Sequence, residues 1–295
     1  MDMESPIAAI GFSDIEKKYN LEKIVSGILD KPTKQVASRK ANQDIIAEYL
    51  KEFGKDMYVM VRIVVRADQK DTKLEIEQCE PYLSSHYTVK VEDLSVECID
   101  DEYNYYAICE EAETGMQFIF WLQNVVEYTE AVEMMQTFNE VQIAALAMEG
   151  TVVLPIEKDE EDEAVEKEER EKIKVMLQKA REGDEDARAK LEEEEKELDD
   201  QLKERMFEED FLSIMSGYFV PTTLVDATYA ILGEITDIQN RKNTQTGEES
   251  YLFTLDVNDM PLEVLINKAN LVGYPSIGMR FMGTCWLQGT IVTSN

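Results

Sequence analysis

Apolar side chains recur at helical spacing in two stretches near the start of the chain. Ser13 can cap a first helix that ends before Pro32, and a second helix is predicted from Asn42 to Phe53 with Gly54 as its stop. In both stretches the apolar side chains fall three or four positions apart, as one buried face of a helix requires. We therefore expect two amphipathic helices before the first strand.

Beyond this point the spacing changes to the alternation typical of strands. Tyr58–Val65 consists almost wholly of residues that favour strands, and Leu74–Glu77 alternates apolar and polar positions. Tyr105–Glu111 and Met116–Leu122 flank a turn in which Gly115 can take a positive φ, which predicts a hairpin. One further helix and two further strands are predicted at Tyr128–Phe138, Val141–Met148 and Thr151–Ile156. Residues 1–156 are thus predicted to form an α+β domain with an antiparallel sheet and helices.

A long acidic segment, residues 157–210, follows this domain. It contains 25 acidic and 12 basic residues, and its few apolar side chains are spaced as on one face of a helix. Gly183 followed by Asp184 is typical of a helix end and the N-cap of a next helix. The segment is predicted to be a helical hairpin whose second helix carries the narrow apolar stripe Ala187, Leu191, Leu198, Leu202 and Met206. It is interpreted either as a spacer between two β-rich modules or as an arm that recruits a basic or apolar helix.

Residues 211–295 contain a dense succession of strand patterns. Five strands are predicted, with an irregular segment after the third: Tyr229–Ile238, Glu249–Val257, Leu262–Asn267, Met279–Leu287 and Gln288–Thr293. A meander of three strands followed by two more, with Gly283 and Gly289 permitting sharp curvature, is typical of a small oligonucleotide/oligosaccharide-binding (OB) barrel. The predicted fold class is α+β: an N-terminal antiparallel sheet with helices, an acidic helical connector and a C-terminal OB-like β-barrel.

Five residues of this last module are candidates for contact with a ligand or partner: Arg241, Lys242, Tyr251, Phe253 and Trp286. The two basic residues stand in the first loop, and the two aromatic residues Tyr251 and Phe253 alternate with Leu252. Proteins that bind single strands combine stacked aromatic rings with several Arg and Lys side chains. Because the module has few bases, its strand aromatics are expected to fill one face of the barrel instead.

The formal net charge of the 295-residue chain is −32. Such a charge repels phosphate backbones and anionic lipid surfaces, so nucleic acid and membranes are not expected partners, whereas an unknown protein is. No apolar run approaches the roughly 20 residues of a spanning helix, and the first residues lack the pattern of a signal peptide. We expect a cytoplasmic protein.

The chain offers no recognisable set of catalytic, cofactor-binding or metal-binding residues. Cys79, Cys98, Cys109 and Cys285 are isolated, so each is expected to be a small apolar residue and not a zinc ligand. The single histidine, His86, could act as a general base, but no nucleophile with an orienting acid can be assigned to it, and a structural role is favoured. No catalytic residue, metal or cofactor is therefore predicted.

Four segments resemble an uncharacterised bacterial family, domain-of-unknown-function family 3881, found in anaerobic Gram-positive bacteria. They are Ile10–Ser13, Ala180–Ala187, Ile231–Ile235 and Trp286–Gly289. The resemblance spans nearly the whole chain, but none of these segments has an assigned chemical role. It therefore implies no activity.

Three classes of function remain open. The charge, the helical hairpin and the lack of a catalytic motif favour a non-enzymatic interaction or scaffold protein. The strand order alone supports an alternative, an OB-like binding module for a single-stranded nucleic acid or an oligosaccharide. An enzyme is the least favoured class, because carboxylate pairs can be chosen almost anywhere in so acidic a chain. The sequence predicts no oligomeric state.

Overall fold

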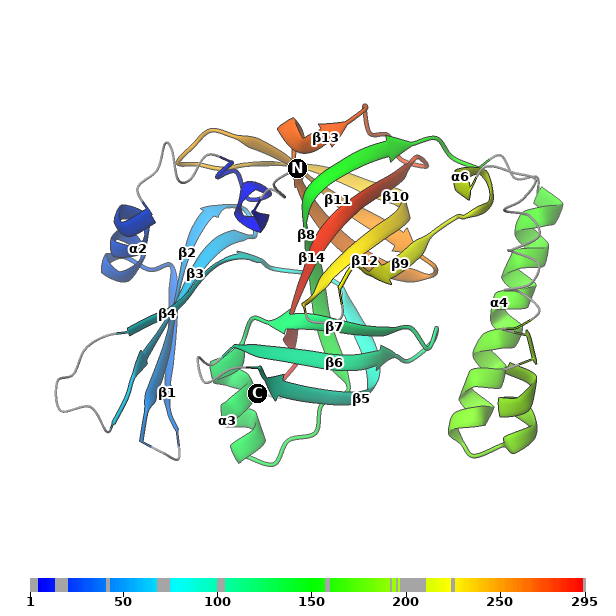
Figure 1. Ribbon diagram of the computed structural model, residues 1–295, viewed down its shortest axis with the longest axis horizontal. Coiled ribbons are helices and arrows are strands. Elements are labelled where there is room, and N and C mark those ends of the chain that lie inside the picture. Colours follow the sequence, from blue (N-terminus) through cyan, green and yellow to red (C-terminus); the bar gives the residue numbers. More distant parts are fainter. Residues whose placement is uncertain are drawn as a thin grey trace.

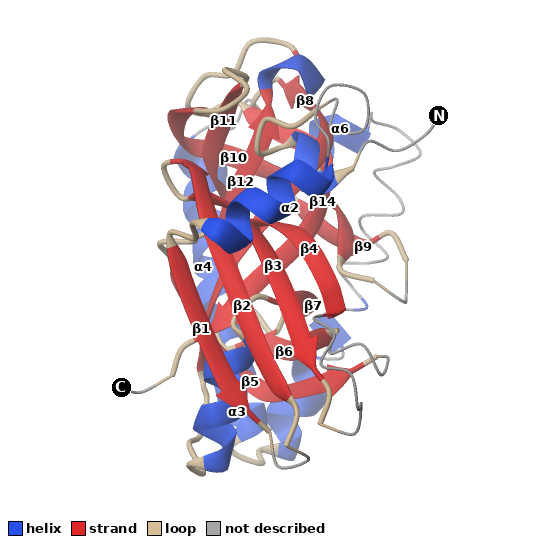
Figure 2. Ribbon diagram, turned by 90° about the vertical axis from the view of Figure 1, so that its left-hand side faces the viewer, coloured by secondary structure: helices blue, strands red, loops and turns tan. Residues whose placement is uncertain are grey.

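The computed structural model describes residues 5–13, 21–40, 43–67, 75–99, 104–156, 160–191, 193–194, 196, 211–223 and 226–293. Within these ranges the protein is mostly β, with two sheets, four α-helices and a further helical stretch at residues 185–191 (Figures 1 and 2). The α-helices are α2 (Leu21–Asp30), α3 (Val125–Glu133), α4 (Glu160–Arg181) and α6 (Phe211–Ile214). Two short 3-10 helices are η1 (Pro6–Ala8) and η2 (Lys268–Asn270).

The smaller sheet is antiparallel, and its four strands follow chain order. They are β1 (Lys34–Arg39), β2 (Ile45–Gly54), β3 (Met57–Val65) and β4 (Glu75–Leu83). β3 was predicted as a strand, and its nearly continuous apolar run is explained by burial on both faces. Val59 and Val61 pack in a cluster with α2, which lies across β2 and β3 (Figure 2), whereas Tyr58 and Met60 pack with Trp121.

The predicted helix Asn42–Phe53 is wrong, because this segment contributes β2. Its side chains alternate in burial, and Ile46, Glu48 and Leu50 share one buried face. Glu48 occupies a buried position where a strand pattern would place an apolar residue. For this reason the alternation of apolar and polar residues typical of a strand is not visible in the sequence of β2. The strand tolerates this carboxylate because Arg62 lies directly opposite on β3, with Nη2 2.8 Å from Glu48 Oε1.

The other predicted helices of this half are present with different bounds. α2 lies within the stretch predicted after Ser13, but residues 14–20 are outside the described part of the chain, so the predicted cap stays a prediction. The Ser13 hydroxyl donates instead to Glu248 Oε1 at 2.9 Å. α3 begins at Val125, three residues earlier than predicted.

The larger sheet is mixed and contains ten strands. They are β5 (Thr88–Cys98), β6 (Tyr105–Glu111), β7 (Gln117–Leu122), β8 (Glu140–Val153), β9 (Tyr218–Pro221), β10 (Thr228–Lys242), β11 (Glu249–Val257), β12 (Met260–Asn267), β13 (Leu271–Val272) and β14 (Arg280–Ile291). Hydrogen-bonded neighbours follow the order β11-β12-β8-β5-β6-β7-β14-β10-β9, and β13 pairs with β8. The predicted β6–β7 hairpin is confirmed, with Gly115 of its turn at a φ of 73°.

Five strands of this sheet are joined in a ring by their pairings. β10 pairs with β11, β11 with β12, β12 with β8, β8 with β14, and β14 again with β10. Every pair is antiparallel except β12–β8, which is parallel. β8 precedes the acidic segment and the other four strands follow it (Figure 1). Strands from both sides of the segment therefore share one sheet, and the three-part division of the chain into domains stays a prediction.

Two predicted strand breaks are absent. β14 is one strand where two were predicted, at 279–287 and 288–293, and β8 is one strand where two were predicted, at 141–148 and 151–156. Gly150 suggested a turn in β8, but the strand continues through it. A glycine is required here for packing, because a Cβ at this position would lie 2.3 Å from the Phe281 ring. The fifth strand of the ring is thus β8 and not a segment of residues 211–295.

Alternate residues of β8 belong to two different apolar clusters. Ile143, Ala145 and Ala147 pack in the cluster to which all five ring strands contribute. Ala144 and Leu146 point the other way and pack with β3, α2 and the segment around η1. Both faces of one strand are buried, so the packing of β8 connects the ring to the smaller sheet.

The buried pair of Arg62 and Glu48 yields a stability prediction. Replacement of Arg62 by Met leaves the Glu48 carboxylate buried without its countercharge, which should lower the free energy of unfolding by about 3–5 kcal/mol. The double variant Arg62→Met with Glu48→Leu should recover most of this loss, because the Glu48 carboxylate is removed together with its countercharge. Urea unfolding measures both, and a single variant within about 1 kcal/mol of wild type would show that the pair does not stabilise the sheet.

Candidate functional site

Arg241, a predicted contact residue, is buried where the two sheets meet. Its Nη2 lies 3.0 Å from Asp56 Oδ2 in the β2–β3 turn and 3.0 Å from Gln239 Oε1. Asp56 Oδ1 is 3.6 Å from His86 Nε2, and His86 Nδ1 is 3.0 Å from Glu263 Oε1 on β12. This series of polar contacts connects the smaller sheet to the ring. Arg241 is engaged in it, so it is not a surface contact.

The two aromatic candidates of β11 lie at different depths. Phe253 is fully buried in the cluster of the ring strands, which places it beyond the reach of a ligand. Tyr251 is half-buried and stacks on Phe253, with ring centroids 5.7 Å apart. The ammonium of Lys268 lies 4.5 Å from the centre of the Tyr251 ring. The pair therefore packs as the alternation suggested, and only Tyr251 reaches the surface.

The last two candidates, Trp286 and Lys242, lie on β14 and at the end of β10. Trp286 is half-buried and its ring centroid is 5.2 Å from that of Trp121. Lys242 is exposed and lies opposite Glu249 in the β10–β11 pair. The five predicted residues therefore do not converge on one site.

The chain itself covers the outer face of β11 and β12. The backbone carbonyls of residues 8–10 accept hydrogen bonds of 2.7–3.1 Å from the side chains of Asn243, Ser250 and Asn267. Leu252 and Leu265, on the same face, belong to the apolar cluster that contains η1. This part of the ring is closed to a large ligand by the protein's own N-terminal segment.

Within its described residues the acidic segment forms two helices joined by a turn at Gly183, as predicted. Gly183 has a φ of 93°, and the Asp184 Oδ1 atom accepts hydrogen bonds from the backbone N–H groups of Asp186 and Ala187 at 3.0 and 3.1 Å. This is the predicted N-cap, and residues 185–191 are helical after it. Ala187 of the predicted stripe is buried and Leu191 half-buried; three members lie outside the described residues, namely Leu198, Leu202 and Met206. We call α4 and residues 185–196 the acidic arm.

One face of α4 is attached to the body of the protein. Arg181 Nη2 lies 2.5 Å from Glu110 Oε1 at the end of β6. Lys174 Nζ lies 3.7 Å from Asp259 Oδ2 in the β11–β12 turn. Between them Leu177 lies against the β6–β7 turn. These residues are spaced three and four apart, so they share one side of the helix and leave the opposite side exposed.

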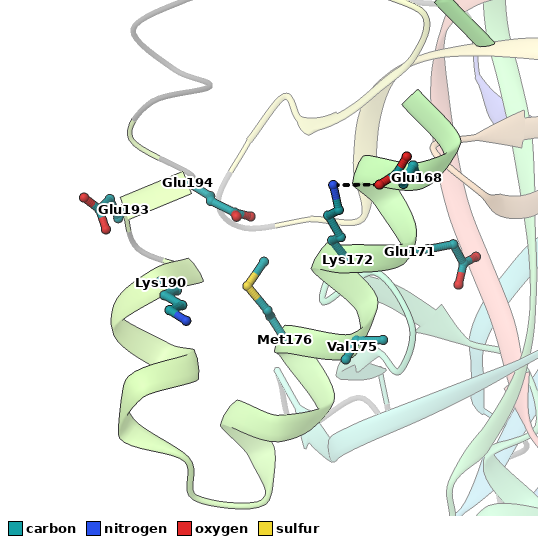
Figure 3. Close-up of a pocket in the computed structure, with 8 residues that line it drawn as sticks. All are labelled: Glu168, Glu171, Lys172, Val175, Met176, Lys190, Glu193 and Glu194. Carbon is teal, nitrogen blue, oxygen red and sulfur yellow. Dashed lines mark ion pairs between the residues drawn. The ribbon is translucent and has the colours of Figure 1, made fainter. Parts of the chain in front are cut away.

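The opposite side faces a groove between α4 and the second helix, with a cavity volume of about 810 Å³ (Figure 3). Met176 points into the gap, and the half-exposed Val175 extends the apolar surface. The charged lining comprises Glu168, Glu171, Glu193, Glu194, Lys172 and Lys190. Lys172 is paired with Glu168, one turn earlier in α4, at 3.0 Å. The groove thus has an apolar floor and a rim with excess negative charge.

Two cysteines have thiol pKa values well above neutral pH. Burial raises the pKa of Cys79 to about 11 and that of Cys109 to about 12, so both stay protonated thiols at neutral pH.

Among the residues that the structure describes, no group of three or more His, Cys, Asp or Glu side chains could hold a metal ion. No described helix combines the length and the hydropathy needed to cross a membrane.

Fold and site together define a mostly β protein in which a ring of strands and a smaller sheet carry an acidic helical arm. The chain belongs to the DUF3881 family: the family model, described as "Domain of unknown function, E. rectale Gene description", matches residues 7–289. This confirms the resemblance carried by Ile10–Ser13 and the three other segments. No curated protein and no solved structure matches the chain.

Removing the Arg181 contact should release the arm. Arg181→Ala loses the ion pair with Glu110 and the hydrogen bond to the Ala112 carbonyl, so the end of α4 loses its main attachment. Amide hydrogen exchange of residues 171–191 should then be several-fold faster than in wild type. Arg188→Ala is the matched control, because Arg188 is exposed and its ion pair among the described residues is with Glu185 in its own helix. Equal exchange in both variants would show that Arg181 does not hold the arm.

Proposed function

We propose that this protein is a non-enzymatic interaction protein whose acidic arm binds a basic, partly apolar helix of a partner protein. The observation that carries the proposal is the groove of the arm, whose floor contains Met176 and Val175 and whose rim is acidic. An apolar side chain of the partner would insert beside Met176, and its Lys or Arg side chains would face the carboxylates. Methionine suits such a site because its flexible side chain adapts to different partners.

The attachment of α4 supports this function over that of a simple spacer. A spacer would bury its apolar side chains between the parts that it separates. Here Arg181, Leu177 and Lys174 hold one side of α4 on the body, while Val175 and Met176 remain available on the other. A rigidly held helix also loses less conformational freedom when a partner binds, which favours affinity.

We further infer that the ring of β10, β11, β12, β8 and β14 is OB-like, with its last strand supplied from before the acidic segment. The OB fold binds ligands on the face of its second and third strands, which would be β11 and β12. Residues 8–10 and η1 lie over that face, and the buried Leu252 and Leu265 point to them. Binding of single-stranded nucleic acid or an oligosaccharide there would require displacement of this segment. The net charge of −32 also opposes nucleic acid.

A comparative pull-down from native lysate, with the intact chain as bait, tests the proposal. Wild-type protein should retain a basic partner that is released as salt is raised, since salt screens the rim charges. Met176→Glu should weaken retention by roughly tenfold or more, because it removes the burial of a Met side chain. Met135→Glu is the matched control, since Met135 is fully exposed on the body and far from the groove in sequence.

The proposal fails if the same partner is recovered equally with wild type and Met176→Glu. It also fails if no stoichiometric partner is recovered at either low or physiological salt. A partner that is retained by both variants but lost with Arg181→Ala would bind the β6–β7 turn and not the groove.

A further inference from the structure

A second cavity, separate from the acidic arm, lies beside the N-terminal end of α3. Its volume is about 260 Å³, somewhat below the roughly 300–1,000 Å³ typical of drug-sized ligands. It is lined by the end of β4, the β4–β5 loop, the start of α3, the start of β8 and the end of β14. Elements from both sheets build it, so its shape is fixed by the fold as a whole.

The lining is polar, and much of its hydrogen-bonding capacity is unused by the protein. The hydroxyls of Tyr82, Ser84, Thr290 and Thr293 line the cavity and make no hydrogen bond to another described residue. Glu127 also lines it, and its buried Oε2 atom has no hydrogen-bond partner within the described chain. An unpaired buried acceptor is costly, so Glu127 Oε2 favours a ligand that donates a hydrogen bond to it.

The neighbouring side chains keep this lining rigid. The Gln123 amide donates to the Leu83 carbonyl at 3.1 Å and to Gln288 Oε1. The Asn124 amide donates to the Ile291 carbonyl at 2.9 Å and accepts from the Ile291 N–H at 3.0 Å. Both residues line the cavity, and their contacts with β4 and β14 fix the start of α3. The cavity is therefore largely preformed, as small-ligand sites usually are.

The charge around the cavity has one sign. Among its lining residues Glu127 is charged, and neither Lys nor Arg is present. Burial raises the pKa of Tyr82, and the charges of Glu127 and Glu48 raise it further, so Tyr82 remains a neutral donor. Burial likewise raises the pKa of Glu48 to about 7, and the neighbouring Glu127 contributes to this shift. A phosphate or carboxylate ligand would be repelled here, whereas an ammonium group would offset the charge of Glu127.

We propose that this cavity binds a small polyhydroxylated amine of the amino-sugar class. The ammonium of the ligand pairs with Glu127, and its hydroxyls form hydrogen bonds with Tyr82, Ser84, Thr290 and Thr293. The hydroxyl-rich lining selects a polyol over an apolar amine, and the lone carboxylate selects an amine over a neutral sugar. The site is independent of the arm, so a ligand could be bound there with or without a protein partner.

Isothermal titration of the full chain with glucosamine, galactosamine and mannosamine tests this inference, with glucose, galactose and mannose as neutral counterparts. At least one amino sugar should bind, and it should bind about tenfold or more tightly than its neutral counterpart. Glu127→Gln should weaken this binding roughly 10- to 100-fold, because it removes hydrogen bonds to a charged group. Glu130→Gln is the matched control, since Glu130 lies one turn further along α3 and does not line the cavity.

Three outcomes would overturn the inference. They are no heat with any amino sugar, equal binding of the neutral sugars, or binding that Glu127→Gln and Glu130→Gln affect equally. Thermal unfolding of each variant confirms that it is folded before titration. If Glu127→Gln does not fold, Thr290→Val replaces it, and its binding should be several-fold weaker than that of wild type.

Discussion

The structure depends most on the position of β8 (Glu140–Val153), which hydrogen-bonds with β5, β12, β13 and β14. Its backbone completes the ring that the four strands beyond the acidic segment begin. Its alternate side chains fill the ring cluster on one face and the cluster of the smaller sheet on the other. Because both faces and both edges are used, neither half of the chain can bury its apolar surface fully without the other. Gly150 permits this arrangement by leaving room for the Phe281 ring.

This constraint decides which surfaces are available for binding. The face of β11 and β12 is taken by η1 and the smaller sheet, and Arg241, Asp56, His86 and Glu263 are engaged at the junction. Two accessible hollows lie away from this junction, namely the groove of the acidic arm and the cavity at the start of α3. The groove suits a basic helix because its apolar floor is surrounded by carboxylates. The cavity suits a small donor-rich cation because it combines hydroxyls with one carboxylate whose Oε2 atom is buried.

Local patterns in the sequence predicted the local structure well. The β6–β7 hairpin, the β3 strand and the Gly183–Asp184 helix boundary each depend on residues that are neighbours in the chain. The errors have non-local causes: Glu48 obscured a strand because its partner Arg62 is on another strand, and Gly150 resembled a turn because Phe281 lies far along the chain. The cavity could not be predicted, because its lining comes from four separate segments of the chain. The groove was not predicted either: none of the apolar stripe expected on the second helix lines it, and the position of Met176 in it depends on which face of α4 is docked.

The shared strand is tested most directly by separate production of residues 1–156 and residues 211–295. We predict that residues 211–295 alone show no cooperative unfolding, because without β8 the edges of β12 and β14 are unpaired and the ring cluster is open. Mixing the two fragments should restore cooperative unfolding and dispersed amide resonances. If residues 211–295 alone unfold cooperatively with a native-like spectrum that residues 1–156 leave unchanged, β8 is not an essential part of the ring and the account is contradicted.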